Sequence, residues 1–159
     1  MEWTEMRANA KLLTSQEIKR FLNQNNVGHL GTFNDDGGPY VVPINYAFLD
    51  DKFVLHCASK GHKISNIQNN QNVCFEVTKH YNTKKSDYSC SKWEVQYESV
   101  VAFCKATLID DNLKRSYLEE FTRFYTKKDY SLSEEGLERT TCIILKIEHM
   151  TGRSSDKHN

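Results

Sequence analysis

The chain has 159 residues, and its 21 lysines and arginines balance 21 aspartates and glutamates. A chain of this length buries about 70% of its unfolded surface and is typical of one domain. The formal net charge of zero argues against a nucleic-acid-binding protein that works by bulk positive charge. With apolar runs of only a few residues, the sequence also lacks the roughly 20 apolar residues of a membrane span.

The N-terminal stretch MEWTEMRANAKLL has no apolar stretch typical of a secretory signal, so we do not expect secretion. The five cysteines are Cys57, Cys74, Cys90, Cys104 and Cys142. Their number is odd and no C-x-x-C pair occurs, so neither a zinc knuckle nor a thioredoxin motif is supported. We therefore expect a reduced, cytoplasmic protein whose cysteines mostly serve as small apolar residues.

Apolar residues at helical spacing predict three helices. The first begins at Thr14, where Glu17 completes a capping box, and it ends in a run of Asn and Gln residues. A short second helix contains Ile64 and Ile67, which share one face. The third helix is expected over Asp111–Tyr125, where an aspartate can cap its start.

Segments rich in Val, Ile, Tyr and Phe predict six β-strands, at Val27–Phe33, Pro39–Phe48, Phe53–Cys57, Val73–Val77, Glu94–Ile109 and Thr140–Ile147. Short turns join the first three strands into an antiparallel meander. Pro43 cannot donate to a ladder, which predicts an edge position or a bulge. The polar stretch 81–91 predicts an exposed loop, and residues after Arg153 a frayed tail. We expect a mainly β fold with flanking helices, a closed or partly open six-stranded barrel.

The segment His56–Lys63, HCASKGHK, links the third strand to the short helix and concentrates positive charge. Its glycine, Gly61, lets a ligand approach the backbone, and the helix N-terminus offers free N–H groups and a positive dipole end. These features suit a phosphate group, although the spacing is not that of a P-loop. The alternative interpretation is a solvated basic turn.

Other motifs for chemistry are weak. His29 and His56 lie on apolar strands, where a histidine is usually structural, although one beside a cofactor could donate or accept protons. The histidine spacings do not match a metal-binding pattern, so we expect no metal site. A serine hydrolase is not supported, because no G-x-S-x-G motif is present.

Several segments, in order, resemble the FMN-binding split-barrel superfamily of pyridoxamine 5'-phosphate oxidase-like proteins. They are residues 27–32, 36–46, 56–63, 73–77, 97–103 and 150–153. Within that superfamily the sequence is most similar to the 5-nitroimidazole-resistance (Nim) proteins. The resemblance covers about Met6 to Arg153, so we expect one FMN-binding split-barrel domain over residues 1–159 with its core at about 6–153.

The resemblance implies a homodimer with two FMN sites at the dimer interface, with FAD as a possible replacement. The implied cofactor contacts are Val42, Pro43, Ile44, Asn45, His56, Cys57, Ala58, Lys60, Gly61, His62, Lys63 and Ser99. Of these, His62 and Lys63 would hold the phosphate, with His62 standing where pyridoxamine phosphate oxidases have arginine. Ser99 would reach FMN from the partner chain. His56 would be the catalytic residue, facing outward toward the dimer groove if Leu55 faces the core.

The function implied is a flavin (FMN)-dependent oxidoreductase acting on a small molecule, with NAD(P)H or another reductant as electron donor. Reduction of nitroimidazoles or nitroaromatics is its more specific form. One alternative is a flavin-binding protein without turnover. Another is a haem-binding split-barrel protein, with His29, His56, His62 or His149 as the axial ligand. Residues 151–159 lack the arginine and histidine segment that binds substrate phosphate in pyridoxamine phosphate oxidases, so we do not expect that activity. We expect neither nucleic acid nor membrane as a partner.

Overall fold

The computed structural model describes residues 10–85, 87, 89, 92–109 and 113–155. The elements in this part of the chain are β1 (Ala10–Leu12), α1 (Ser15–Gln24), β2 (Val27–Phe33), β3 (Pro39–Leu49), β4 (Lys52–Ala58), α2 (His62–Asn69), β5 (Asn72–Lys84), β6 (Glu94–Ile109), α3 (Leu113–Thr126), α4 (Glu134–Arg139) and β7 (Thr140–Ser155). None of the helices in the described ranges is long and apolar enough to cross a membrane.

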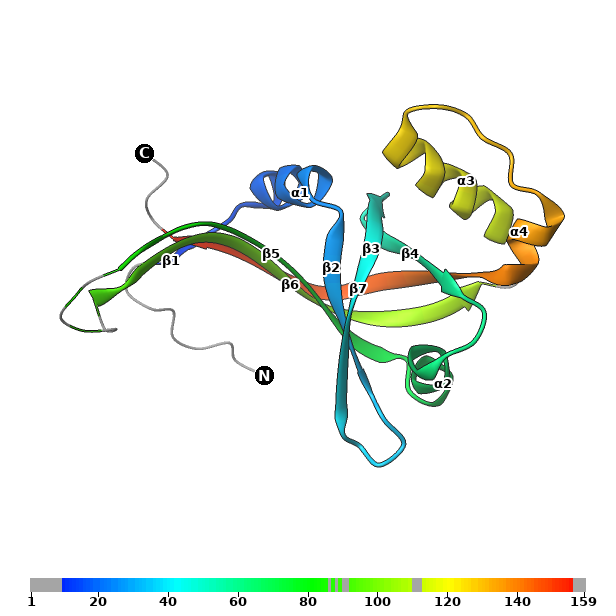
Figure 1. The fold of residues 1–159 in the computed structure, drawn as a ribbon, viewed down its shortest axis with the longest axis horizontal. Helices are drawn as coiled ribbons and strands as arrows, with labels where there is room; N and C mark the ends of the chain where they lie inside the picture. Colours follow the sequence, from blue (N-terminus) through cyan, green and yellow to red (C-terminus); the bar gives the residue numbers. More distant parts are fainter. Residues whose placement is uncertain (1–9, 86, 88, 90–91, 110–112, 156–159) are drawn as a thin grey trace.

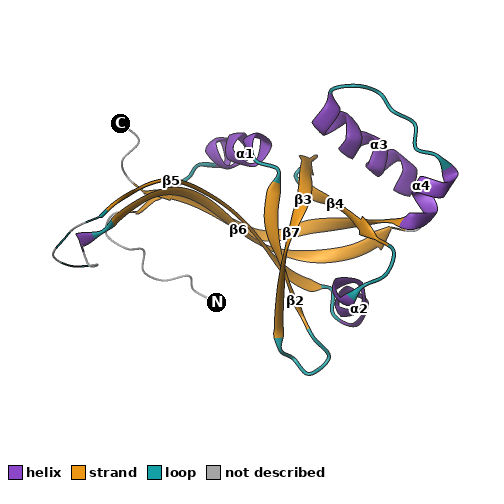
Figure 2. Ribbon diagram, in the orientation of Figure 1, coloured by secondary structure: helices purple, strands orange, loops and turns teal. Residues whose placement is uncertain are grey.

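Six of the strands close into an antiparallel ring in the order β7-β4-β3-β2-β5-β6, with β6 pairing back onto β7. Figures 1 and 2 show the helices outside this barrel, with α3 and α4 on one side and α2 below. The predicted number of six strands is one short of the seven found. The missed strand, β1, has three residues and is defined by its pairing with the end of β7, where Leu12 lies opposite Arg153.

Strands β5, β6 and β7 extend beyond the barrel as a long arm, with α1 lying over it (Figure 1). The predicted end of β5 at Val77 and the loop predicted from Tyr81 are wrong, because β5 pairs with β6 as far as Lys84. The last strand likewise continues past Ile147 to Ser155. These polar ends are held by backbone pairing with neighbouring strands, which needs no apolar periodicity.

The meander and the Pro43 prediction are confirmed. Strand β2 pairs with β3, which pairs with β4. Pro43 lies opposite His29 of β2, whereas β4 pairs with β3 only over Tyr46–Leu49. The first half of β3 is therefore unpaired on the side that faces β4. A proline, which has no N–H, costs no strand-to-strand hydrogen bond there.

The capping box is also confirmed. The Thr14 hydroxyl accepts from the Glu17 amide at 3.3 Å, and the Glu17 carboxylate accepts from the Thr14 amide at 2.8 Å. Helix α3 matches the third predicted helix in its described part, while the expected aspartate cap lies in residues 110–112, outside the described residues. Helix α4 was not predicted, since its six residues include no buried side chain.

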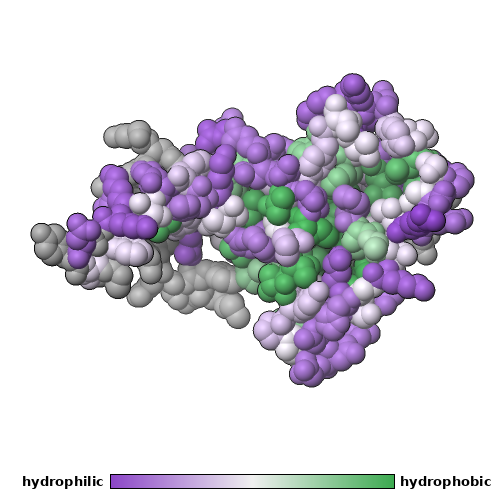
Figure 3. Space-filling model, viewed as in Figure 1, coloured by the Kyte–Doolittle hydropathy of each residue, from purple (hydrophilic) through white to green (hydrophobic). Residues whose placement is uncertain are grey.

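Two apolar clusters hold the fold together. The barrel interior is built around Tyr46, Phe53 and Phe75, all fully buried and in edge or tilted ring contacts. A second cluster forms outside the barrel, where Leu118 and Phe121 of α3 pack on strands β3, β4 and β7. Figure 3 shows apolar residues gathered over the barrel and polar residues over the arm and the β2–β3 turn. Helix α3 thus covers one outer face of the barrel.

Candidate functional site

The N-terminus of α2 is open and uncapped. Gly61 is the N-cap residue, with φ of 142°, and a Cβ placed on it would meet nothing within 4 Å. The Ile64 amide donates to the Gly61 carbonyl at 2.9 Å, so the helix begins directly after this glycine. No side chain in the described ranges caps the helix start. The first amide groups of α2 and its positive dipole end therefore face a space that an anion can enter.

Lys63 places a cation on the first turn of α2. Its side chain is half-buried and forms no ion pair with any described residue. Burial raises the pKa of the nearby Cys57 thiol, and the Lys63 ammonium partly opposes this effect. Lys60, in the preceding turn, is exposed. The two lysines and the open helix N-terminus form the α2 site, whose amide donors and positive charge suit a phosphate monoester.

His62 is held by the β2–β3 hairpin. Its Nε2 lies 2.8 Å from the Asn34 side-chain oxygen, and the edge of its ring meets Tyr40 at 4.7 Å between centroids. Asn34 also accepts from Asn66 of α2 at 3.2 Å. With Nε2 donating to Asn34, the ring has Nδ1 left for a ligand. His62 therefore links α2 to the hairpin, and its Nδ1 atom is a further ligand-binding group at the α2 site.

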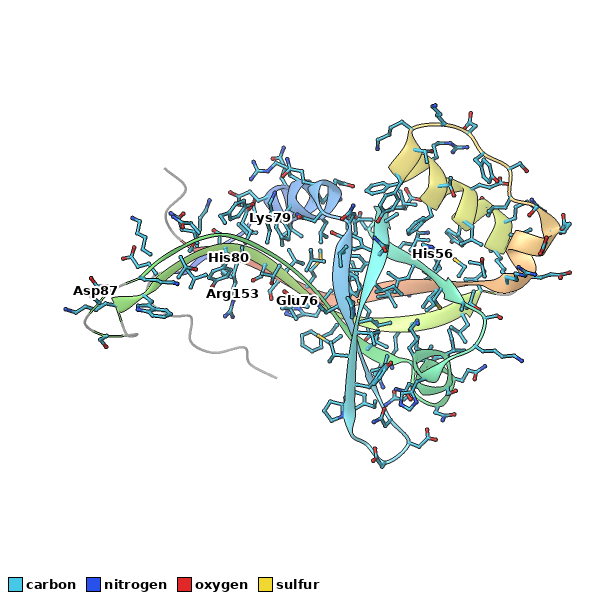
Figure 4. The ribbon with its side chains drawn as sticks, viewed as in Figure 1. His56, Glu76, Lys79, His80, Asp87 and Arg153 are labelled. Atoms are coloured by element: carbon cyan, nitrogen blue, oxygen red, sulfur yellow. The ribbon has the colours of Figure 1, made fainter. Side chains whose placement is uncertain are left out.

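His56 lies on the outer face of β4, as predicted from the burial expected for Leu55. Leu55 is fully buried, whereas His56 is exposed. The ring of His56 meets that of Phe121 edge-on at 4.5 Å, so α3 of the same chain lies directly against it (Figure 4). Partial desolvation of the His56 ring lowers its pKa, which favours the neutral imidazole at neutral pH.

A hollow of about 290 Å³ opens beside His56, between α3 and the outer face of the barrel. We call it the α3 hollow; its walls are His56, Leu118, Phe121, Thr122, Tyr125, Thr126, Leu132 and Thr140. Asn45 of β3 lies close to it, because Asn45 precedes Tyr46, and Tyr46 pairs with Leu55, the residue before His56. The Asn45 amide and the Tyr125 hydroxyl both donate to the Asn26 carbonyl, at 3.3 and 3.0 Å. The structure thus brings together His56 and Asn45, two of the predicted residues.

The remaining predicted residues are spread over both faces of the sheet. Ile44 is buried in the core, and Val42 and Cys57 pack against it. Pro43 and Ala58 are exposed.

Ser99 lies elsewhere, on β6 between Thr78 and Arg153. Figure 4 shows Arg153 on the arm, away from His56. One chain therefore does not bring Ser99 to the α2 site or to His56.

Sequence reasoning missed the contributions of α3 and of the hairpin. Phe121 and Tyr125 are four residues apart, so their shared helix face was visible in the sequence. That this face covers His56 depends on how α3 docks on β4, and nothing local indicates it. The sequence predicts Asn34 only as part of a turn and Tyr40 only as part of a strand, yet both contact His62.

A second hollow, of about 430 Å³, does not suit a phosphate. It lies between the β2–β3 turn and the end of α2, and its walls are Phe33, Asn34, Asp35, Gly37, Asn69 and Asn70. Its one charged residue is a carboxylate, which repels anions. Within the described part of the chain, no three His, Cys, Asp or Glu side chains converge as a metal site.

Comparison with known proteins assigns the fold. The sequence profile of the family described as pyridoxamine 5'-phosphate oxidase matches residues 14–154, so the chain belongs to this pyridoxamine 5'-phosphate oxidase-like family. The chain matches no curated protein in sequence.

Several solved structures share the fold. A candidate 5-nitroimidazole antibiotic resistance protein from Bacteroides thetaiotaomicron is 26% identical, with a TM-score of 0.75 over 96% of both chains. The FAD and heme binding protein from Mycobacterium smegmatis is 18% identical, with a TM-score of 0.82 over 94% of this chain and 74% of the other. A FAD-binding protein from Mesorhizobium loti is 23% identical, with a TM-score of 0.65 over 92% of this chain and 98% of the other.

Proposed function

We propose that the protein is a flavin-dependent oxidoreductase that holds the phosphate of FMN at the α2 site. The observation that carries this proposal is the open N-terminus of α2 beside Lys63, in a chain of the pyridoxamine 5'-phosphate oxidase-like family. Structural neighbours named as FAD-binding proteins support a flavin as the cofactor. FMN and FAD share the phosphate that is attached to the ribityl chain of the flavin. The α2 site fits this phosphate in either cofactor.

The flavin would supply the transfer of electrons between a reductant and a small-molecule substrate. Lys63 and the first amides of α2 bind and neutralise the phosphate. The end of β4, at Ala58, leads from His56 to the α2 site, which begins at Gly61. The neutral His56 imidazole can donate an N–H hydrogen bond to a substrate that gains electrons. Nitroimidazoles and nitroaromatics are substrates of this kind, and the similarity to the Bacteroides protein favours them.

A homodimer would complete the site. The outer face of β2 and β3 exposes apolar side chains, with Val27 46%, Phe33 45% and Val41 62% exposed. By register this face continues across β5 to Val101 and Ser99 of β6. The described helices pack elsewhere: α1 against Gly152 on the opposite face, α2 on the hairpin and α3 on β4. A second copy seated on this face would cover the apolar residues and bring the partner's Ser99 toward the flavin.

The first test is the absorption spectrum of the purified protein, followed by titration with FMN. Flavin bands near about 375 and 450 nm, together with saturable FMN binding, would support the proposal. Oxidation of NAD(P)H coupled to reduction of a nitroaromatic then separates an oxidoreductase from a flavin-binding protein without turnover. Absence of saturable flavin binding would refute the proposal.

Haem binding is a second candidate, because two similar structures carry haem or cytochrome in their names. Besides the mycobacterial protein, the flavocytochrome Anf3 from Azotobacter vinelandii has a TM-score of 0.78 at 20% identity, over 92% of this chain and 69% of the other. Of the possible axial ligands, His29 contacts Glu76 at 3.1 Å and His62 contacts Asn34. His56 has no hydrogen-bond partner among the described residues and is the ligand we favour for this alternative. A Soret band after haem reconstitution, lost in His56→Ala, would support it.

A further inference from the structure

The size of the α3 hollow limits what can occupy it. Its volume is about 290 Å³. An engineered apolar cavity of about 150 Å³ binds benzene, and pockets for drug-sized ligands begin at roughly 300 Å³. The hollow can therefore hold one substituted six-membered ring.

The walls of the hollow are fixed by hydrogen bonds from α3 to the barrel and to the following loop. The Tyr125 hydroxyl donates to the Tyr46 carbonyl at 2.7 Å. The Arg115 guanidinium donates to the Leu132 carbonyl at 2.6 Å, which holds Leu132 over the hollow. Because these walls are held in place without a ligand, binding requires little ordering of the chain.

The lining is apolar on one side and offers few free polar groups. Leu118 and Phe121 are 4% and 8% exposed and form the apolar wall with Leu132. The hydroxyl of Thr122 donates to the Leu118 carbonyl at 2.8 Å, and that of Thr126 donates to the Thr122 carbonyl at 2.9 Å. These hydroxyls are therefore already engaged as donors.

The His56 imidazole, in contrast, forms no hydrogen bond with a described residue and borders the hollow. No lysine, arginine, aspartate or glutamate is among the lining residues. A charged ligand would lose its hydration there without gaining a counter-charge. The lining therefore favours a neutral molecule that has one hydrogen-bonding group.

We propose that the α3 hollow binds one small, neutral, planar molecule with a single aromatic ring. Its ring packs on Phe121, and its hydrogen-bond acceptor faces His56. As a binding site the hollow is independent of any flavin. Its role as the substrate pocket rests on the proposed function, because Asn45, which lies close to the hollow, lies on the strand expected beside the flavin.

The test uses benzamide, benzoate and toluene as probes, titrated into the full-length, flavin-free protein at pH 8 by calorimetry or ligand-observed NMR. We expect benzamide to bind at least tenfold more tightly than benzoate. Thr122→Trp fills the hollow and abolishes benzamide binding. The His56→Leu variant weakens benzamide binding by roughly 2- to 12-fold and leaves toluene binding unchanged, since only benzamide accepts a hydrogen bond. This variant keeps the test valid if Thr122→Trp fails to fold.

The matched control is Phe124→Leu, on the same helix and in the same apolar cluster but outside the lining. It should leave benzamide binding unchanged, whereas Phe121→Leu weakens it by roughly 2- to 12-fold. The proposal is overturned if benzamide does not bind the wild type up to about 10 mM. It is also overturned if a folded Thr122→Trp binds benzamide normally, or if His56→Leu weakens benzamide and toluene equally.

An FMN titration of the same samples separates this inference from the proposed function. Benzamide binding without FMN binding would leave the α3 hollow standing and refute the flavin proposal. FMN binding without benzamide binding would refute the α3 hollow as a ligand site and leave the flavin proposal intact.

Discussion

Replacing Lys63 with alanine removes the half-buried cation on the first turn of α2. Lys63 lies on that turn, next to the uncapped Gly61. A hydrogen bond to a charged group contributes about 1.5–3 kcal/mol. At 1.4 kcal/mol for each factor of ten, Lys63→Ala should weaken FMN binding roughly 10- to 150-fold. The upper part of that range applies if the phosphate is shielded from solvent by a second subunit, because screening is weaker there.

The assay is quenching of flavin fluorescence, with FMN and riboflavin titrated in parallel. Riboflavin has no phosphate, so its affinity should be equal in wild type and Lys63→Ala. Lys63→Arg keeps the charge and should retain most of the FMN affinity. Lys146→Ala, an exposed lysine on β7, is the matched control and should change nothing. Lys63 does not bind the phosphate if Lys63→Ala changes FMN affinity less than twofold, or weakens riboflavin binding as much as FMN binding.

Three further predictions test the site and the fold. His56→Ala should lower reductase turnover roughly 100-fold, the scale of a lost hydrogen-bond donor to developing negative charge, with little change in FMN affinity; loss of FMN with turnover per bound flavin intact would make His56 a cofactor contact. Gly28→Ala should destabilise the protein by about 1–3 kcal/mol in urea unfolding, because the added Cβ would lie 2.4 Å from a Phe75 ring carbon. At Gly31 the nearest atom would be 3.4 Å away, so Gly31→Ala should cost clearly less. Hydrogen bonds from Lys11 and Thr14 lower the pKa of Glu17 from 4.5 to about 2. Its stabilising contribution is therefore present above about pH 4.5 and lost as the pH falls toward 2, so the melting temperatures of wild type and Glu17→Gln should converge over that range.

The sequence predicted those elements whose signals are local. Strands β2 and β6 were predicted with both ends correct, since turn residues or an apolar alternation mark them. The start of α1 was marked by its capping box. By contrast, β1 and the polar half of β5 are strands only because β7 and β6 supply their hydrogen bonds. Pairing between segments far apart in the chain leaves no local pattern in such short or polar stretches.

In the candidate site, too, only the features with a local sequence signal could be predicted. The concentration of Lys60, Gly61 and Lys63 at the start of a helix was visible in the sequence, and the structure places them at an open helix N-terminus. The outward direction of His56 followed from strand alternation. The contact between Phe121 and His56 could not be predicted from strand alternation. It depends on how α3 docks on β4, which is decided by packing between apolar faces that many arrangements could satisfy.

The most direct test of the account is a crystal structure of the protein grown with FMN. We expect the phosphate at the N-terminus of α2, within hydrogen-bonding distance of the Lys63 ammonium and the first helix amides. We also expect a second copy of the chain on the outer face of β2 and β3, with the partner's Ser99 near the flavin. A flavin phosphate bound elsewhere, with the N-terminus of α2 left to solvent, would contradict it.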